Sequence, residues 1–145
     1  MSAAMTTPPN RTSRLVLEFR AGDKMLVNGA ALQFQTRASV VLSNRVRFLF
    51  GKQILAPNDA NTPARRLYFA IQAAYICEDV ERPQFLDLAR DLAAEYADAS
   101  TSPTVQRLIA KAIEELEEGK CWEAMRRVRE LFQHDDAMLA EPKQE

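Results

Sequence analysis

Apolar and polar residues alternate through the first third of the chain, and this pattern predicts about five short β-strands. The predicted strands lie within residues 15–20, 24–27, 31–36, 38–42 and 45–50. Period-two alternation is typical of strands with one buried face. Asn28-Gly29 joins two of these segments, and this dipeptide is the strongest short signal for a two-residue hairpin turn. Short strands joined by tight turns predict an antiparallel β meander or a small barrel.

After residue 61 the apolar spacing changes to the helical period of three to four residues. Thr62-Pro63 and Ser102-Pro103 each place an N-cap hydroxyl before a proline at the first helical position. Pro83 opens a further helix, and Gly119 ends one and is followed at once by another. Four helices are therefore expected. The first, from residue 63 to about 78, has apolar residues around most of its circumference and is predicted to be the central buried helix.

The predicted fold class is α+β, with the β meander or small barrel packed on a C-terminal bundle of about four helices. One compact domain suits a chain of 145 residues. We expect a disordered tail at 1–13, a basic β-rich subdomain at 14–56, an α-helical subdomain at 62–134 and a flexible tail at 135–145. Residues 1–13 lack a secretory signal pattern, and no stretch has the length and apolarity of a membrane span. A cytoplasmic location without membrane contact is expected.

The net charge of −1 conceals a strong asymmetry along the chain. Residues 1–66 carry ten Lys/Arg against three Asp/Glu, a net of +7, whereas residues 67–145 carry nine against seventeen, a net of −8. Such a division suggests an anionic partner for the first half. Attraction between the two halves, within the fold or across a dimer, explains the same asymmetry equally well.

The sequence contains no residue pattern of the kind that a catalytic site or a metal site requires. His134 is the single histidine and lies near the predicted frayed end, where a buried, oriented base is not expected. Cys77 and Cys121 lack metal-ligand spacing and are interpreted as reduced, apolar thiols, with a disulfide or metal site as the alternative. Clustered carboxylates on the second and third helices are interpreted as solvated faces, with an acidic docking surface as the alternative. We therefore expect no enzymatic activity, no cofactor and no metal.

The basic residues of the first half are the candidate binding site. The candidates are Arg37, Arg45, Arg47, Lys52, Arg65 and Arg66. Cations in the first turn of a helix oppose its dipole, so local stability does not explain Arg65 and Arg66. RNA phosphate is one possible partner, and an internal carboxylate such as Asp59 or Glu78 is the other. Phe48 and Phe50 are the aromatic residues near these cations, but the strand pattern assigns both to the core.

The segment from Arg45 to Tyr75 bears on the choice between RNA and an internal carboxylate as the partner of these cations. Its most specific part is Thr62 to Ala70 (TPARRLYFA), followed by Gln72 and Tyr75. Together with the upstream residues LVLEFRAGDKMLVNGA, it resembles the FlbT family of flagellar biosynthesis regulators. The Asn28-Gly29 turn and the Arg47-Phe48-Leu49 strand also match, and the resemblance spans roughly Leu15 to Phe132.

This resemblance implies a post-transcriptional regulator of flagellin synthesis. Such a protein associates with the 5′ untranslated region of flagellin mRNA, lowers its stability or translation, and works alongside the small regulator FlaF. The resemblance supplies no RNA-contacting residues, so the six basic candidates rest on charge and position alone. The main rival is a protein–protein adapter that reaches mRNA only through a partner, and the sequence pI of about 5.9 favours it. A structural flagellar component is a third hypothesis.

Overall fold

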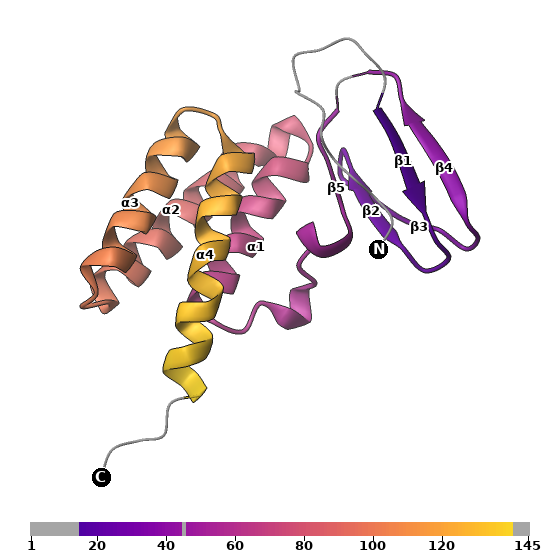
Figure 1. Cartoon of the computed structure of the whole chain (residues 1–145). Coiled ribbons are helices and arrows are strands. Elements are labelled where there is room, and N and C mark those ends of the chain that lie inside the picture. The colour runs from indigo at the N-terminus through magenta and orange to yellow at the C-terminus, as the bar shows by residue number, and fades with distance from the viewer. Residues whose placement is uncertain (1–14, 45, 141–145) are drawn as a thin grey trace. The chain divides into compact units, whose positions relative to one another are not determined.

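The computed structural model describes residues 15–44 and 46–140, so Arg45 and the predicted tail at 1–13 lie outside the described residues. The α+β class is confirmed, and the chain divides into a strand unit, residues 1–54, and a helical unit, residues 55–145 (Figure 1). The strands are β1 (Leu15–Phe19), β2 (Lys24–Val27), β3 (Ala30–Gln33), β4 (Ala38–Leu42) and β5 (Phe48–Phe50). The α-helices are α1 (Pro63–Ile76), α2 (Arg82–Ala99), α3 (Pro103–Glu117) and α4 (Cys121–Ala140).

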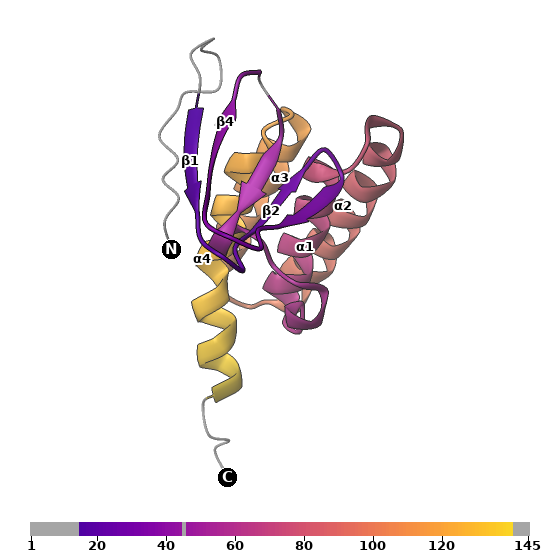
Figure 2. The same cartoon turned by 90° about the vertical axis from the view of Figure 1, so that its right-hand side faces the viewer.

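The strands form two small antiparallel sheets rather than a closed barrel. β1 pairs with β4, and β2 pairs with both β3 and β5 (Figures 1 and 2). The β2–β3 hairpin closes as predicted, because Asn28 and Gly29 take φ values of 48° and 83°. The order β1–β4 departs from a simple meander. The β2–β3 hairpin forms between neighbouring segments. β1, which precedes the hairpin in sequence, pairs with β4, which follows it.

Aromatic stacking builds the core of the strand unit. Phe19 stacks on Phe34 with 4.1 Å between ring centroids and meets Phe50 edge-on at 6.2 Å. Phe48 is partly buried against the same cluster, so the prediction that Phe48 and Phe50 belong to the core is confirmed. Leu49 is also buried, however, so β5 does not alternate as its sequence predicts. Strands buried on both faces lose that alternation.

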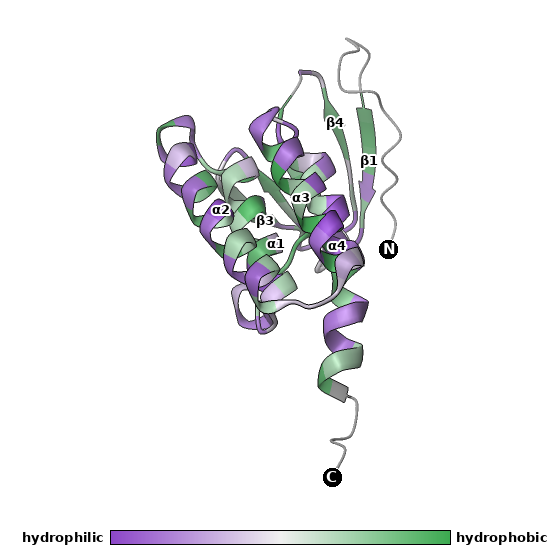
Figure 3. Cartoon of the chain, turned by 90° about the vertical axis from the view of Figure 1, so that its left-hand side faces the viewer, coloured by the Kyte–Doolittle hydropathy of each residue, from purple (hydrophilic) through white to green (hydrophobic). Residues whose placement is uncertain are grey.

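Helix α1 is the central helix of its unit, as predicted, and packs against both α2 and α4. Its N-terminus has the predicted cap: the Thr62 hydroxyl accepts the Arg65 backbone N–H at 3.2 Å, and Pro63 occupies the first helical position. Ser102 caps α3 in the same way at 3.3 Å. Gly119 has φ of 78° and ends α3 as predicted. Hydrophilic and hydrophobic stretches alternate along α2 and α3 (Figure 3), as expected of helices with one buried side.

Helix α4 extends further than the sequence predicts. It continues to Ala140, whereas the predicted helical subdomain ends at residue 134 and is followed by a flexible tail. Asp135 is only 6% exposed and bonds two other helices, which holds this part of α4 in place. Past Asp136 the side chains of Met138 and Leu139 are exposed. The polar character of this segment therefore reflects a buried polar contact rather than an unfolded end.

Candidate nucleic-acid interface

Three of the six candidate cations lie in the described part of the strand unit, and all three are exposed. Arg37 immediately precedes β4, Arg47 precedes β5, and Lys52 lies in the short 3₁₀ turn Gly51–Gln53 after β5. The Arg47 backbone carbonyl accepts the Asn28 N–H at 3.3 Å, which ties the entry to β5 to the hairpin turn. Arg45 lies outside the described residues. All three side chains therefore lie at the solvent-exposed surface of this unit.

Cations outnumber carboxylates in the described part of the strand unit. Residues 15–44 and 46–54 contain five of them: Arg20, Lys24, Arg37, Arg47 and Lys52. The same residues hold two carboxylates, Glu18 and Asp23. Glu18 accepts the Ser39 hydroxyl at 3.1 Å, and Asp23 accepts the Arg20 backbone N–H at 2.8 Å. The described part of this unit therefore has three more cations than carboxylates.

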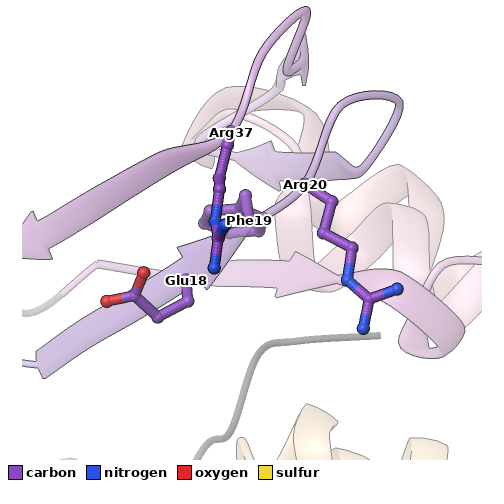
Figure 4. Close-up of a pocket in the computed structure, with 4 residues that line it drawn as sticks. All are labelled: Glu18, Phe19, Arg20 and Arg37. Atoms are coloured by element: carbon purple, nitrogen blue, oxygen red, sulfur yellow. The ribbon is translucent and has the colours of Figure 1, made fainter.

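A partly open hollow in the strand unit is lined by Glu18, Phe19, Arg20 and Arg37 (Figure 4). Both arginines reach it from the ends of paired strands, since Arg20 follows β1 and Arg37 precedes β4. Arg20 is not among the residues predicted from the sequence. Finding it requires the β1–β4 pairing, because only that pairing brings the two ends together.

Arg65 is held by the protein's own carboxylate. Its guanidinium donates two hydrogen bonds to Asp136, at 2.7 and 3.0 Å, and lies 4.6 Å from the ring centre of Phe132. Hydrogen bonding to Asp136 raises the pKa of Arg65, and the same bond lowers the pKa of the Asp136 carboxyl. An internal carboxylate was one of the two predicted partners. It is Asp136 on α4 rather than Asp59 or Glu78.

Arg66 differs from its neighbour. Its side chain is exposed, and among the described residues the structure gives it no hydrogen bond or ion pair. The backbone N–H of Arg66 donates to the Thr62 carbonyl at 2.8 Å, as the first helical turn requires. Of the two adjacent arginines, Arg66 is therefore the one whose guanidinium is available to a partner.

A buried polar network joins α1, α2 and α4. The Asp135 carboxylate accepts the Ala64 backbone N–H at 2.8 Å and also accepts the Tyr96 hydroxyl. Arg129 donates to the Tyr68 hydroxyl at 3.0 Å and lies 4.8 Å from the centre of that ring. Burial is the main cause that raises the pKa of both Tyr68 and Tyr96. These contacts stabilise helix packing and are not arranged around a reacting atom.

The acidic face predicted for the third helix is partly wrong. Glu115 is only 6% exposed, and Arg127 of α4 donates to both of its carboxylate oxygens, at 3.3 and 2.7 Å. This hydrogen bonding lowers the pKa of Glu115. Arg90 of α2 bridges to Glu117 in a similar way, at 2.6 Å. The α3 carboxylates therefore fasten neighbouring helices rather than form one free solvated face.

The described residues do not gather reactive or metal-binding side chains at one place. Cys77 and Cys121 are both free thiols, the first half-buried and the second buried. Within residues 15–44 and 46–140 no three His, Cys, Asp or Glu side chains lie close enough together to hold a metal ion. None of the helices in those ranges combines the length and apolarity needed to cross a lipid bilayer.

Comparison with known proteins identifies the family. The model of the family described as "Flagellar protein FlbT" matches residues 15–139. This chain belongs to the FlbT family. A FlbT relative from Chelativorans is 31% identical over 135 residues, covering 89% of this chain and 88% of its own. Relatives from Brucella ovis and Brucella anthropi are 31% and 29% identical, covering 92% and 90% of this chain and 88% and 86% of theirs.

All three relatives are named probable flagellum biosynthesis repressor protein FlbT. No solved structure matches the chain. The match to the FlbT family confirms the resemblance found in the sequence, and its most specific segment now has a structural explanation. In residues 62–70, Thr62 caps α1, Ala64 and Arg65 bind carboxylates of α4, and Tyr68 bonds Arg129. The FlbT-like motif in this chain is therefore a helix-docking segment.

Proposed function

We propose that this chain is a post-transcriptional repressor of flagellin synthesis that acts in the cytoplasm. It associates with the 5′ untranslated region of flagellin mRNA and lowers the stability or translation of that message. Membership of the FlbT family and the repressor names of the relatives support the regulatory role in flagellum biosynthesis. The excess of exposed cations in the strand unit is the observation that favours direct RNA contact.

Phosphate contacts carry the proposed affinity. The contacts are assigned to the strand-unit cations Arg37, Arg45, Arg47 and Lys52, and to Arg66 at the start of α1. Arg65 contributes less, because Asp136 already occupies its guanidinium. The aromatic rings of Phe19, Phe48 and Phe50 belong to the core cluster, so base stacking on them is not part of the proposal. Binding of this kind is steeply salt-dependent and weakly dependent on RNA sequence.

The decisive experiment is a filter-binding titration of the purified full chain against flagellin leader RNA at several salt concentrations. An unrelated RNA of the same length serves as the reference. We expect a steep decline of affinity with salt, because each phosphate neutralised on a single strand contributes about −0.7 to the log–log slope. The paired substitution Arg45→Gln and Arg47→Gln should weaken binding to both RNAs and flatten the slope. Absence of binding by the folded wild-type chain contradicts direct RNA contact.

A protein–protein adapter is the alternative function, and exposed apolar side chains on the helical unit favour it. Val80 is 83% exposed, and Leu88 on α2 is 45% exposed. The proposed partner is the small flagellin regulator FlaF, docking on the acidic helical half. A pull-down from cell extract with and without nuclease separates the two functions. After nuclease treatment an adapter still retains its protein partner and loses flagellin mRNA, whereas a direct binder binds the leader RNA when purified without any partner.

A further inference from the structure

The antiparallel pairing of β1 with β4 sets two arginines opposite each other. The last registered pair of the two strands is Phe19 with Ala38. Arg20 is one residue beyond Phe19, and Arg37 is one residue before Ala38, so the two arginines occupy the next opposed positions. Both line the same hollow (Figure 4). The strand pairing therefore brings two cations that are 17 residues apart in the chain to the lining of one hollow.

Both arginines belong to the exposed face of the β1–β4 sheet. Leu17 and Phe19 point into the core, whereas Glu18 is exposed and bonds Ser39, its registered partner. With the side-chain period of two, Arg20 follows Glu18 on this outer face, and Arg37 precedes Ser39 on it. Both arginines are exposed, in agreement with this placement. The outer face thus changes from a hydrogen-bonded polar pair to a cation pair at its end.

This arrangement is unfavourable for the isolated protein. Like charges directly opposite each other on paired strands lower the stability of the sheet. Among the described residues, the structure gives neither guanidinium a hydrogen bond or ion pair. Glu18, the carboxylate in the hollow, already accepts the Ser39 hydroxyl. Neither packing nor a local ion pair therefore explains why Arg20 and Arg37 occupy these positions. A bound anion would relieve the repulsion between the two guanidinium groups.

We propose that Arg20 and Arg37 form a clamp for a backbone phosphate of single-stranded RNA. Each guanidinium presents several N–H donors in a planar fork that fits two phosphate oxygens. The hollow is partly open to solvent, so a phosphate within a continuous strand can reach it. This inference rests on the proposed RNA association and adds Arg20 to it.

The test compares the paired variant Arg20→Gln with Arg37→Gln against a matched control. Lys24→Gln is the control. Lys24 is an exposed cation on β2, in the other small sheet, and its registered partner is the neutral Gln33. Filter binding to flagellin leader RNA is measured for each protein across a range of salt concentrations. Loss of the clamped phosphate should lower affinity about tenfold and reduce the salt slope by about 0.7. The control should reduce both quantities much less.

Two further readouts distinguish a phosphate clamp from a structural role. The midpoint of thermal unfolding of the paired variant should equal or exceed that of the wild type, since the repulsion has been removed. Glu18→Gln should raise RNA affinity, because it removes the negative charge from the hollow. A paired variant that unfolds at lower temperature and keeps the wild-type salt slope overturns the clamp. If the wild-type chain binds RNA and the variant binds equally well, the clamp alone fails; if the wild type binds no RNA, the proposed function fails with it.

Discussion

Asp135, close to the end of α4, accepts the backbone N–H of Ala64, in the first turn of α1, at 2.8 Å. The two residues are 71 positions apart in the chain. The first N–H groups of a helix have no partner within that helix, and a carboxylate there also interacts favourably with the helix dipole. Thr62 satisfies the Arg65 N–H from the other side of the same turn. The start of the central helix is therefore completed by a distant segment.

The buried Asp135 is predicted to be one of the most stabilising side chains of the helical unit. Asp135→Ala leaves the Ala64 N–H and the Tyr96 hydroxyl without their acceptor and should lower the free energy of unfolding by about 2–4 kcal/mol. Tyr96→Phe removes one of the two bonds and should cost about 1–2 kcal/mol. Urea unfolding measures both values, and Asp91→Ala on the exposed side of α2 is the control, expected within about 0.5 kcal/mol of wild type. Equal losses in Asp135→Ala and the control would contradict the assignment.

Alkaline pH should unfold the helical unit through its buried tyrosines. Burial first, and then the hydrogen bond to Asp135, raise the pKa of Tyr96 above its ordinary value. Burial also raises the pKa of Tyr68. A raised pKa means that the folded state favours the neutral phenol, so this stability is complete below about pH 10 and is lost as pH rises further. Ultraviolet absorbance of tyrosinate, followed with circular dichroism, should show ionisation coinciding with unfolding. Tyr96→Phe should weaken the decline of stability above that pH.

The ion pair between Glu115 and Arg127 is predicted to matter through the cost of leaving one partner alone. Arg127→Gln leaves a buried carboxylate without its two N–H donors and should lower the free energy of unfolding by about 1–3 kcal/mol. The double variant Glu115→Gln with Arg127→Gln should be less destabilised than the sum of the two single variants. A double-mutant cycle in urea measures this difference. Additive single losses would show that the two side chains do not interact.

The adjacent Arg65 and Arg66 should respond oppositely to the same substitution. Arg65→Gln breaks the pair with Asp136 and should lower stability while leaving the salt slope of RNA binding nearly unchanged. Arg66→Gln changes an exposed side chain and should leave stability unchanged while flattening the slope by about 0.7. Unfolding and filter binding on the same protein preparations provide both readouts. A flattened slope for Arg65→Gln with normal stability would reverse the assignment.

Local signals placed much of the fold. The Asn28-Gly29 turn, the caps at Thr62 and Ser102, and the helix end at Gly119 all stand where their residue types predict. Each of these features is formed by residues within about four positions of one another. Local sequence therefore specifies them before any distant contact forms. The hydrophobic pattern also identified α1 as the central helix and the phenylalanines of β5 as core residues.

The polar partners were decided by tertiary structure. The sequence placed residues 135–145 in a flexible tail, yet Asp135 and Asp136 lie in α4 and bind the start of α1. The polarity of the sequence cannot show this, because a polar segment has the same composition whether it is solvated or accepts hydrogen bonds from buried donors. A carboxylate near a chain end gains its role only when packing brings helix donors to it.

The amino-acid sequence by itself determined the α+β class, the turns and caps, the charge asymmetry and the similarity to FlbT proteins. The tertiary structure alone decided that β1 pairs with β4, and this pairing brings Arg20 and Arg37 to the lining of one hollow. It also decided that Arg65 is occupied and Arg66 is exposed, although both follow the same cap. The physical reason is range: turns and caps depend on neighbouring residues, whereas strand pairing and ion pairing depend on which distant segments the packed core brings together.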